Sequence, residues 1–230
     1  MFDPHQQGTD ERVWRAALDA VPSWLPATAR LLVVSPHPDD EVLGAGGLIR
    51  HWTRARRPVT LLSITDGEAA YTDWPGLGLL RRSELQQALA ILGGTRPLAV
   101  GLNIPDGRVQ QHGEALRAAL AALCDRDTTL IAPYEADGHP DHDAAGAVCR
   151  EFAQTAGLAI ARYPIWAWHH STPAAMPARW GRFPLQPHTQ RAKTAAVRCF
   201  RSQLRPDQRA PIIPAHVLAY FSRPYEAFVL

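Results

Sequence analysis

Residues 31–49 read LLVVSPHPDDEVLGAGGLI, and this stretch decides the fold of the chain. It begins as an apolar run typical of a buried strand and ends as the start of a helix. Four ionisable residues lie between the two within five positions: His37, Asp39, Asp40 and Glu41. Ionisable groups next to an apolar strand are costly to desolvate unless they bind a cation or do chemistry. We therefore expect a functional site at this turn.

A second polar cluster, DGHPDH at residues 137–142, also follows soon after an apolar run. Apolar runs predict strands over 31–34, 59–64, 97–102, 128–132 and 158–166. Helical periodicity predicts helices between them over 42–57, 79–92, 114–124 and 143–156. This alternation predicts an α/β fold, with a parallel sheet covered by helices on both faces. Because such sheets bind ligands at the carboxyl ends of their strands, we expect the two clusters to meet there.

The ends of the chain are less regular. Residues 1–29 are expected to form an extension with a short amphipathic helix, whose apolar stripe is Val13, Ala17 and Val21. Residues 30–230 are expected to form one domain, since 230 residues with 46% hydrophobic content suffice for one sizeable core. Within it, 171–187 is predicted to be a loop and 189–204 a helix, followed by a proline-rich stretch.

Composition excludes several classes of protein. A net charge of +2 is too small for a typical nucleic-acid binder. The widely spaced Cys124, Cys149 and Cys199 argue against a disulfide framework and against a cysteine zinc site. The polar N-terminus lacks the apolar core of a signal peptide, and no apolar run is long enough to span a membrane. These features favour a cytoplasmic protein.

The two clusters together contain the residue types of a catalytic metal centre. His37 and Asp40 are three residues apart at a turn, and His142 can supply a third ligand. Two histidines and one carboxylate, with one open position, form a common catalytic zinc set. Asp39 is then the natural general base for a water molecule in that position. His139 and Asp141 form a further pair, in which the carboxylate would orient the imidazole as a proton donor or charge stabiliser. This inventory suits hydrolysis of an amide or an ester.

A simpler alternative is that Asp39, Asp40 and Glu41 only stabilise the helix N-terminus, where acidic residues are favoured. It leaves His37 and the second cluster unexplained. A serine hydrolase has no support, because the sequence contains no GxSxG motif.

The motifs SPHPDDEVLGAGGLI and GHPDHDAAG resemble the two signatures of the PIG-L/LmbE-like deacetylase family. Weaker matches, including the turn that ends at Glu68, extend the resemblance over roughly residues 30–204. The resemblance implies a Rossmann-like α/β fold and a zinc-dependent N-deacetylase of N-acetylglucosamine-type conjugates. Such a ligand set can also accept Fe²⁺ or Co²⁺. The amino-sugar conjugate would be the small-molecule partner, and the sequence identifies no interface for a homo-oligomer.

Carried over residue by residue, the resemblance gives roles that agree with the chemistry above. The expected metal ligands are His37, Asp40 and His142, and the expected general base is Asp39. His139 matches the histidine that stabilises the oxyanion or protonates the leaving amine, and Asp141 matches its orienting partner. The expected substrate-binding residues in this part of the chain are Glu68, Arg81 and Asp106.

Two tryptophans follow the fifth predicted strand, in the sequence IWAWHH. Trp166 and Trp168 can form a platform for a sugar face, or they can be buried against the C-terminal helix. The 171–187 region and the residues after Leu204 are expected to set the substrate.

Two other classes of function stay open. One is a metal-dependent esterase or phosphoesterase, although phosphoryl transfer usually requires two metals or a basic phosphate clamp. The other is a non-catalytic sugar-binding relative, which would be expected to have lost Asp39, His139 or Asp141; all three residues are present.

Overall fold

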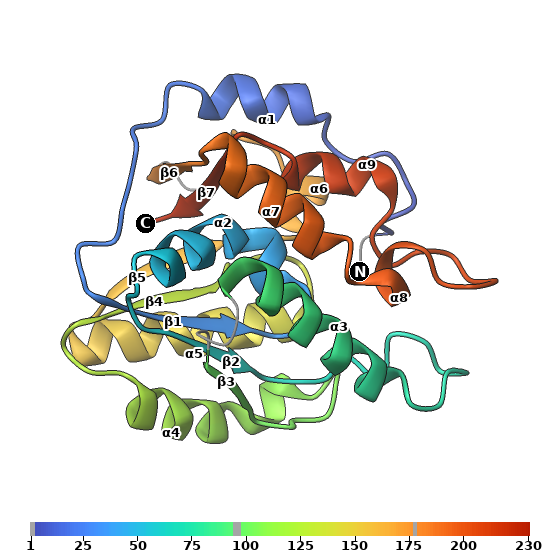
Figure 1. Cartoon of the computed structure of the whole chain (residues 1–230), viewed down its shortest axis with the longest axis horizontal. Helices are drawn as coiled ribbons and strands as arrows, with labels where there is room; N and C mark the ends of the chain where they lie inside the picture. The colour runs from blue at the N-terminus through green and yellow to red at the C-terminus, as the bar shows by residue number, and fades with distance from the viewer. Residues whose placement is uncertain (1–2, 94–97, 177–178) are drawn as a thin grey trace.

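The computed structural model describes residues 3–93, 98–176 and 179–230. Within them, seven strands form one sheet in the order β3-β2-β1-β4-β5-β7-β6 (Figure 1). The strands are β1 (Arg30–Ser35), β2 (Val59–Ser63), β3 (Leu98–Gly101), β4 (Thr128–Pro133), β5 (Ala159–Tyr163), β6 (Trp180–Pro184) and β7 (Tyr225–Val229). The first five are parallel to one another, as predicted. Pro97, where the third strand was predicted to begin, lies outside the described residues.

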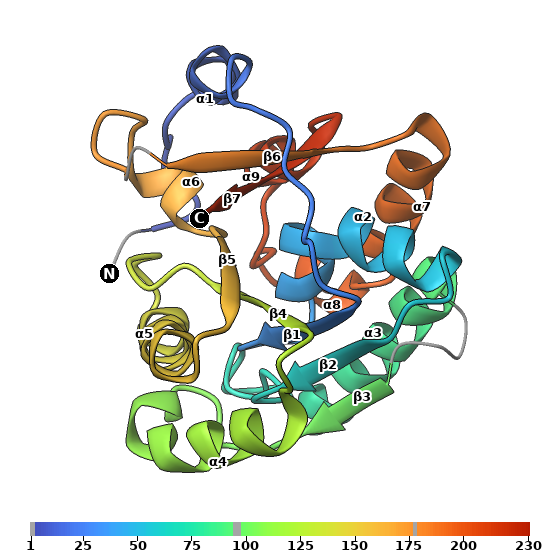
Figure 2. The ribbon, with the colours of Figure 1, turned by 90° about the vertical axis from the view of Figure 1, so that its left-hand side faces the viewer.

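Helices cover both faces of this sheet (Figure 2). One face carries α2 (Asp40–Arg54), α3 (Leu77–Gly93) and α7 (Pro187–Val197), and the other carries α4 (Gly113–Leu123) and α5 (Pro140–Ala156). Shorter elements are α1 (Glu11–Leu18), η1 (Val109–His112), α6 (Ala167–His170), α8 (Arg201–Leu204), α9 (Ala215–Leu218) and η2 (Ala219–Phe221). The predicted α/β fold with a mostly parallel sheet is confirmed.

Strand β1 shows why helices must pack on both faces of the sheet. Its side chains alternate, so that Leu31 and Val33 join the core beneath α2 while Leu32 and Val34 join the core beneath α4 and α5. All four are buried. An apolar run of this kind is stable only in the middle of a sheet that is packed on both sides.

The order of the strands also fixes where a ligand can bind. Strand β1 pairs with β2 on one side and with β4 on the other, so the chain reverses direction across the sheet at this point. The connections after β1 and β4 therefore diverge, and a crevice opens at their carboxyl ends. The two polar clusters of the sequence lie in the turns after these two strands.

The C-terminal part of the chain differs from the prediction. Strand β6 lies within the region predicted to be a loop, and β7 lies in the tail after the proline-rich stretch. Both are antiparallel to their neighbours and complete the sheet. Because β6 is the outermost strand, it tolerates Pro184 and keeps one side partly exposed, which hides it from pattern analysis. The helix predicted over 189–204 is divided into α7 and α8.

Helix α1 is present, but its buried side is not the predicted stripe. Trp14 and Leu18 are buried, whereas Val13 is 49% exposed. The Trp14 indole N–H donates to the carbonyl of Trp168 at 2.7 Å, which ties α1 to α6.

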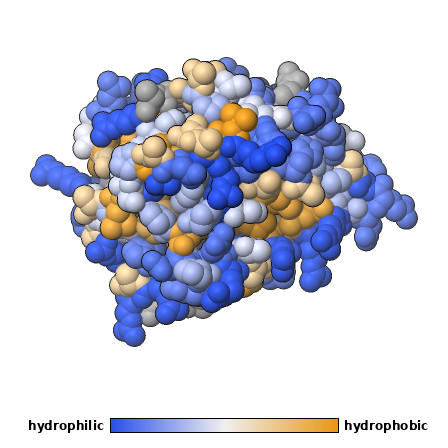
Figure 3. Space-filling model, turned by 90° about the horizontal axis from the view of Figure 1, so that it is seen from above, coloured by the Kyte–Doolittle hydropathy of each residue, from blue (hydrophilic) through white to orange (hydrophobic). Residues whose placement is uncertain are grey.

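The face of the molecule seen from above is mostly hydrophilic, with hydrophobic side chains in separate patches (Figure 3). Within the described ranges, no helix is both long and apolar enough to cross a membrane.

Candidate active site

Three ligand atoms from the two clusters converge on one point. His37 Nδ1 lies 3.4 Å from Asp40 Oδ2, His142 Nε2 lies 3.2 Å from the same oxygen, and the two nitrogens are 3.1 Å apart. Ligands of a tetrahedral zinc ion with bonds of about 2.0–2.1 Å stand about 3.3 Å from one another. These three residues, the metal triad, therefore already have the spacing that zinc requires.

The second nitrogen of each histidine in the metal triad faces a carboxylate. His142 Nδ1 lies 2.8 Å from Asp137 Oδ2, and His37 Nε2 lies 3.1 Å from Asp106 Oδ1. Histidines that bind metals usually donate their other ring N–H to a carboxylate or carbonyl, which fixes the tautomer and the ring orientation. The donor set and its supports thus fit a metal ion.

Within the metal triad, the carboxylate and the imidazoles stabilise one another's charged forms. Although burial opposes protonation, the negative charge of Asp40 and the hydrogen bond with Asp137 raise the pKa of His142 to about 9. Burial also disfavours the charged form of Asp40, but His142 and His37 hold its pKa well below its usual value. A cation at the same point would take the place of these protons, since histidine ligands bind metals in the neutral form.

Asp137 was not assigned a role from the sequence, although it opens the second cluster. Its side chain is fully buried, and it accepts hydrogen bonds from the backbone N–H groups of Ile165, Trp166 and Ala167 at 2.8–3.0 Å. These bonds fix Asp137 against the start of α6 and point its carboxylate at His142. An aspartate soon after a predicted strand, five residues before a predicted ligand, was the signal available in the sequence.

The structure corrects the role predicted for Asp141. Its carboxylate accepts from the backbone N–H groups of Gly107 and Val109 at 2.7 and 3.1 Å, and it lies 3.3 Å from His37 Nε2. His139 instead accepts, through Nδ1, from the backbone N–H of Asp141 at 3.3 Å. The carboxylate was expected to orient His139, whereas its contacts hold His37 and the turn before η1.

Asp39 lies beside the metal triad in a strained conformation. Its φ of 144° is rare for a residue with a side chain, and such strain persists at functional sites where the surroundings enforce it. Arg81 Nη2 lies 3.3 Å from Asp39 Oδ2 and donates to the carbonyl of Pro38 at 3.0 Å. Burial raises the pKa of Asp39 to about 7, although the positive charge of Arg81 opposes the shift.

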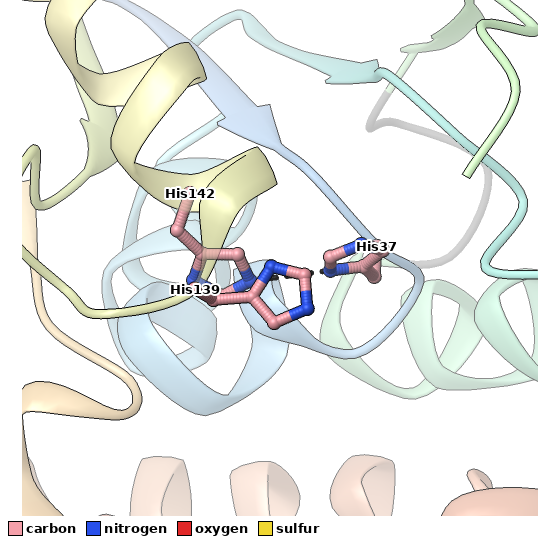
Figure 4. A group of neighbouring side chains, drawn as sticks. All are labelled: His37, His139 and His142. Carbon is pink, nitrogen blue, oxygen red and sulfur yellow. Dashed lines mark hydrogen bonds between the residues drawn. The ribbon is translucent and has the colours of Figure 1, made fainter. Parts of the chain in front are cut away.

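His139 flanks the metal triad from the start of α5, and its ring lies beside those of His37 and His142 (Figure 4). Its ring centroid is 4.9 Å from those of both other histidines. Burial and the positive charges of His142 and His37 lower the pKa of His139 to about 3. His139 is therefore neutral near pH 7, and with Nδ1 as acceptor its hydrogen is on Nε2.

A cavity of about 860 Å³ opens over these residues, and we call it the catalytic cavity. Its polar end contains His37, Asp39, Asp40, Arg81, Asp106 and His139. Its apolar wall contains Leu43, Ile165, Trp166, Pro211, Ile212 and Ile213. Pro4 and His5, from the N-terminal extension, also line it.

Two predicted substrate-binding residues lie outside the lining of the catalytic cavity. Glu68 is exposed and accepts from the backbone N–H of Asp106 at 2.9 Å, so it supports that turn. Trp168 is 3% exposed, stacks on Trp180 with centroids 5.3 Å apart, and lies under the Arg223 guanidinium at 4.3 Å. Trp168 is therefore buried and does not form an open sugar platform, and its ring packs on Trp180 of β6 and Trp14 of α1.

Comparisons with known proteins agree with the family resemblance of the sequence motifs. The PIG-L family model, described as GlcNAc-PI de-N-acetylase, matches residues 32–153. A 1D-myo-inositol 2-acetamido-2-deoxy-alpha-D-glucopyranoside deacetylase of Rhodococcus erythropolis is 30% identical over 63% of this chain and 58% of its own length. The diacetylchitobiose deacetylase of Thermococcus kodakarensis is 30% identical over 56% of this chain and 51% of its own. The chain thus spans a little over half the length of these relatives.

Among solved structures, a conserved protein of Thermus thermophilus superposes with a TM-score of 0.65 at 27% identity. The match covers 87% of this chain and 93% of the other. The match therefore extends beyond the family-matched residues 32–153, which alone would be a little over half of the chain.

Proposed function

The chain belongs to the PIG-L, or GlcNAc-PI de-N-acetylase, family, and from this premise we propose that it is a metal-dependent hydrolase. The proposed reaction removes the acetyl group, or another small acyl group, from the nitrogen of an amino-sugar conjugate. The observation that carries the proposal is the spacing of His37 Nδ1, Asp40 Oδ2 and His142 Nε2, which suits one metal ion at the polar end of the catalytic cavity.

His37, Asp40 and His142 would hold the ion, with Asp137 and Asp106 behind the two imidazoles. When bound, a zinc ion would act as a Lewis acid on the amide carbonyl and make water nucleophilic at neutral pH. Zinc is the proposed metal, and Fe²⁺ or Co²⁺ are alternatives for the same donor set.

Asp39 is the proposed general base. A pKa of about 7 leaves a large fraction of Asp39 ionised near neutral pH, and the group remains basic enough to accept a proton from the attacking water. The contact with Arg81 fixes the carboxylate at the edge of the cavity. Once protonated, Asp39 can pass the same proton to the leaving amine.

His139 is the proposed stabiliser of the developing oxyanion. Because its ring is neutral near pH 7 and its Nδ1 accepts from the Asp141 backbone, Nε2 carries the hydrogen. A fixed N–H donor of this kind stabilises the charge that develops on a carbonyl oxygen. A neutral imidazole is a weaker proton donor than imidazolium, so the amine would receive its proton from Asp39.

The two ends of the catalytic cavity suggest how the substrate lies. The amide would face the polar end, where Arg81 and Asp106 border the space beside Asp39 and His37. The remainder of the conjugate would extend along the apolar wall, which includes Trp166.

The test is release of free amine from a panel of N-acetylglucosamine conjugates by metal-loaded protein. The panel would include inositol and chito-oligosaccharide conjugates, with p-nitrophenyl acetate and p-nitrophenyl phosphate as ester and phosphoester probes. The proposal predicts amine release that Asp39→Asn suppresses. Turnover of an ester or phosphoester alone would assign the site to the other hydrolase class.

A further inference from the structure

A second cavity, of about 810 Å³, lies apart from the metal triad. Its lining comes from α7, α8, α9 and η2, and Ile213 contributes both to it and to the catalytic cavity. We call it the arginine groove, after three of its lining residues: Arg198, Arg201 and Arg205.

The charge of the arginine groove is unbalanced. All three arginines are exposed, and the lining contains no aspartate or glutamate. Across residues 3–93, 98–176 and 179–230, no carboxylate oxygen comes within 4.0 Å of their guanidinium nitrogens. Lys193 also lines the groove, but it is buried and its Nζ pairs with Glu226 at 2.7 Å. The three guanidinium groups therefore provide the uncompensated positive charge.

The floor of the groove is apolar. Val197, Leu204, Leu218 and Phe221 are partly buried there, beside the buried Ile213. Exposed arginines are common, but here they border a hollow with an apolar floor that a ligand can enter. Guanidinium groups bind carboxylates and phosphates through paired hydrogen bonds, and the floor would bury an aliphatic or aromatic group.

We propose that the arginine groove binds a small soluble organic anion, with a carboxylate or phosphate head and an apolar body. The head would contact the arginines and the body would cover the floor. This site is separate from the proposed hydrolytic reaction, so it stands whether or not that reaction is confirmed.

The test is calorimetric titration of the full chain with n-octyl phosphate and with octanoate, each below its critical micelle concentration. Neutral n-octyl glucoside serves as the uncharged ligand. The variants are the combined Arg198→Gln, Arg201→Gln and Arg205→Gln substitution, and Thr194→Glu, which places a negative charge on an exposed position of the lining. Arg191→Gln is the matched control, because Arg191 is exposed on α7 but does not line the groove.

Saturable binding of at least one of the two anions is expected. Added salt and both groove variants should weaken it by roughly tenfold or more, and the control should not. Comparison of the two anions tells which head group is preferred.

Absence of saturable binding, equal affinity for octyl glucoside, or unchanged binding in the triple variant and in Thr194→Glu would overturn the proposal. Binding only to vesicles of anionic phospholipid, and not to the soluble anions, would also overturn it. Melting temperatures of all variants should match the parent, since the substituted side chains are exposed.

Discussion

The polar end and the apolar wall of the catalytic cavity come from different kinds of chain segment. The polar end comes from short contiguous motifs after β1 and β4, from the turn before η1 and from Arg81 on α3. The apolar wall comes mainly from Ile165 and Trp166, just before α6, and from residues 211–213, and residues 4–5 also line the cavity. The polar end is thus placed by the parallel sheet, whereas the wall is placed by packing between distant parts of the chain.

This difference assigns the chemical reaction to the polar end of the cavity and the choice of substrate to its apolar wall. Chemistry depends on a few side chains held at about the spacing of a metal ion, so it requires rigid strand ends. Selection of a substrate requires only shape and polarity, which irregular segments can supply. We therefore expect substitutions at the polar end to abolish turnover, and substitutions in the wall to change which conjugate is preferred.

The largest effect is expected at Asp39. Asp39→Asn should lower kcat by roughly 10²–10⁴-fold, because the amide cannot accept the proton of the attacking water. Bound metal should remain, since Asp39 lies outside the metal triad. Steady-state kinetics and metal analysis of the same preparation check both parts.

Asp73→Asn is the matched control for Asp39→Asn. Asp73 also lines the catalytic cavity, but it is exposed and pairs with Arg209 at 3.0 Å. Its substitution should leave kcat close to the parent value. Near-normal turnover by Asp39→Asn on the best substrate would refute the assignment of the base.

The next effect is expected at Asp137, behind the ligand His142. Asp137→Asn should weaken metal binding by roughly 10–100-fold, because the carboxylate that orients the imidazole and raises its basicity is lost. Competition against a chelator of known affinity measures this change. Asp143→Asn is the control, since its carboxylate accepts from the backbone N–H of Gly138 rather than from a ligand. Equal metal affinity in folded Asp137→Asn would show that Asp137 only supports α6.

A smaller and selective effect is expected in the wall. Ile212→Ala should lower kcat/KM by about threefold to tenfold for conjugates with an apolar aglycone, because it removes apolar contact area. The same variant should act on unsubstituted N-acetylglucosamine oligomers at nearly the parental rate. An equal loss on both groups of substrates would mean that Ile212 serves every substrate. It would contradict the distinction between the polar end and the apolar wall.

The smallest effect is expected at His5. Its backbone neighbour Pro4 is held by His216, whose Nε2 lies 2.9 Å from the Pro4 carbonyl, so the segment has a fixed place beside the cavity. His5→Ala should change KM by less than about fivefold and leave kcat unaltered. A large loss of kcat would mean that the N-terminal segment reaches the reacting groups.

The contrast between rigid strand ends and irregular segments also explains which features could be predicted from the sequence. Apolar runs such as 31–34 and 128–132 predict central parallel strands, because burial on both faces leaves no other pattern. The convergence of His37, Asp40 and His142 was predictable for a related reason, since they lie in the turn after one of these strands or in the first turn of the helix that follows each strand. The family resemblance of SPHPDDEVLGAGGLI added the expected roles.

Other features depend on contacts that no local pattern records. Strand β6 is half exposed and ends in Pro184, so its residues resemble a loop until β7 pairs with it. Asp141 is close to His139 in sequence, but the backbone N–H groups of Gly107 and Val109 draw its carboxylate toward the side of His37. Trp168 is buried because Trp14 and Trp180 pack on it from distant parts of the chain.

The central claim is that His37, Asp40 and His142 form one metal site. The most direct measurement is metal content per chain by mass spectrometry, for parent protein and His142→Ala purified without chelator and then incubated with zinc. The account predicts about one zinc per parent chain and loss of most of it in a folded His142→Ala. A parent chain that retains no metal, or a His142→Ala variant that retains it fully, would contradict the account.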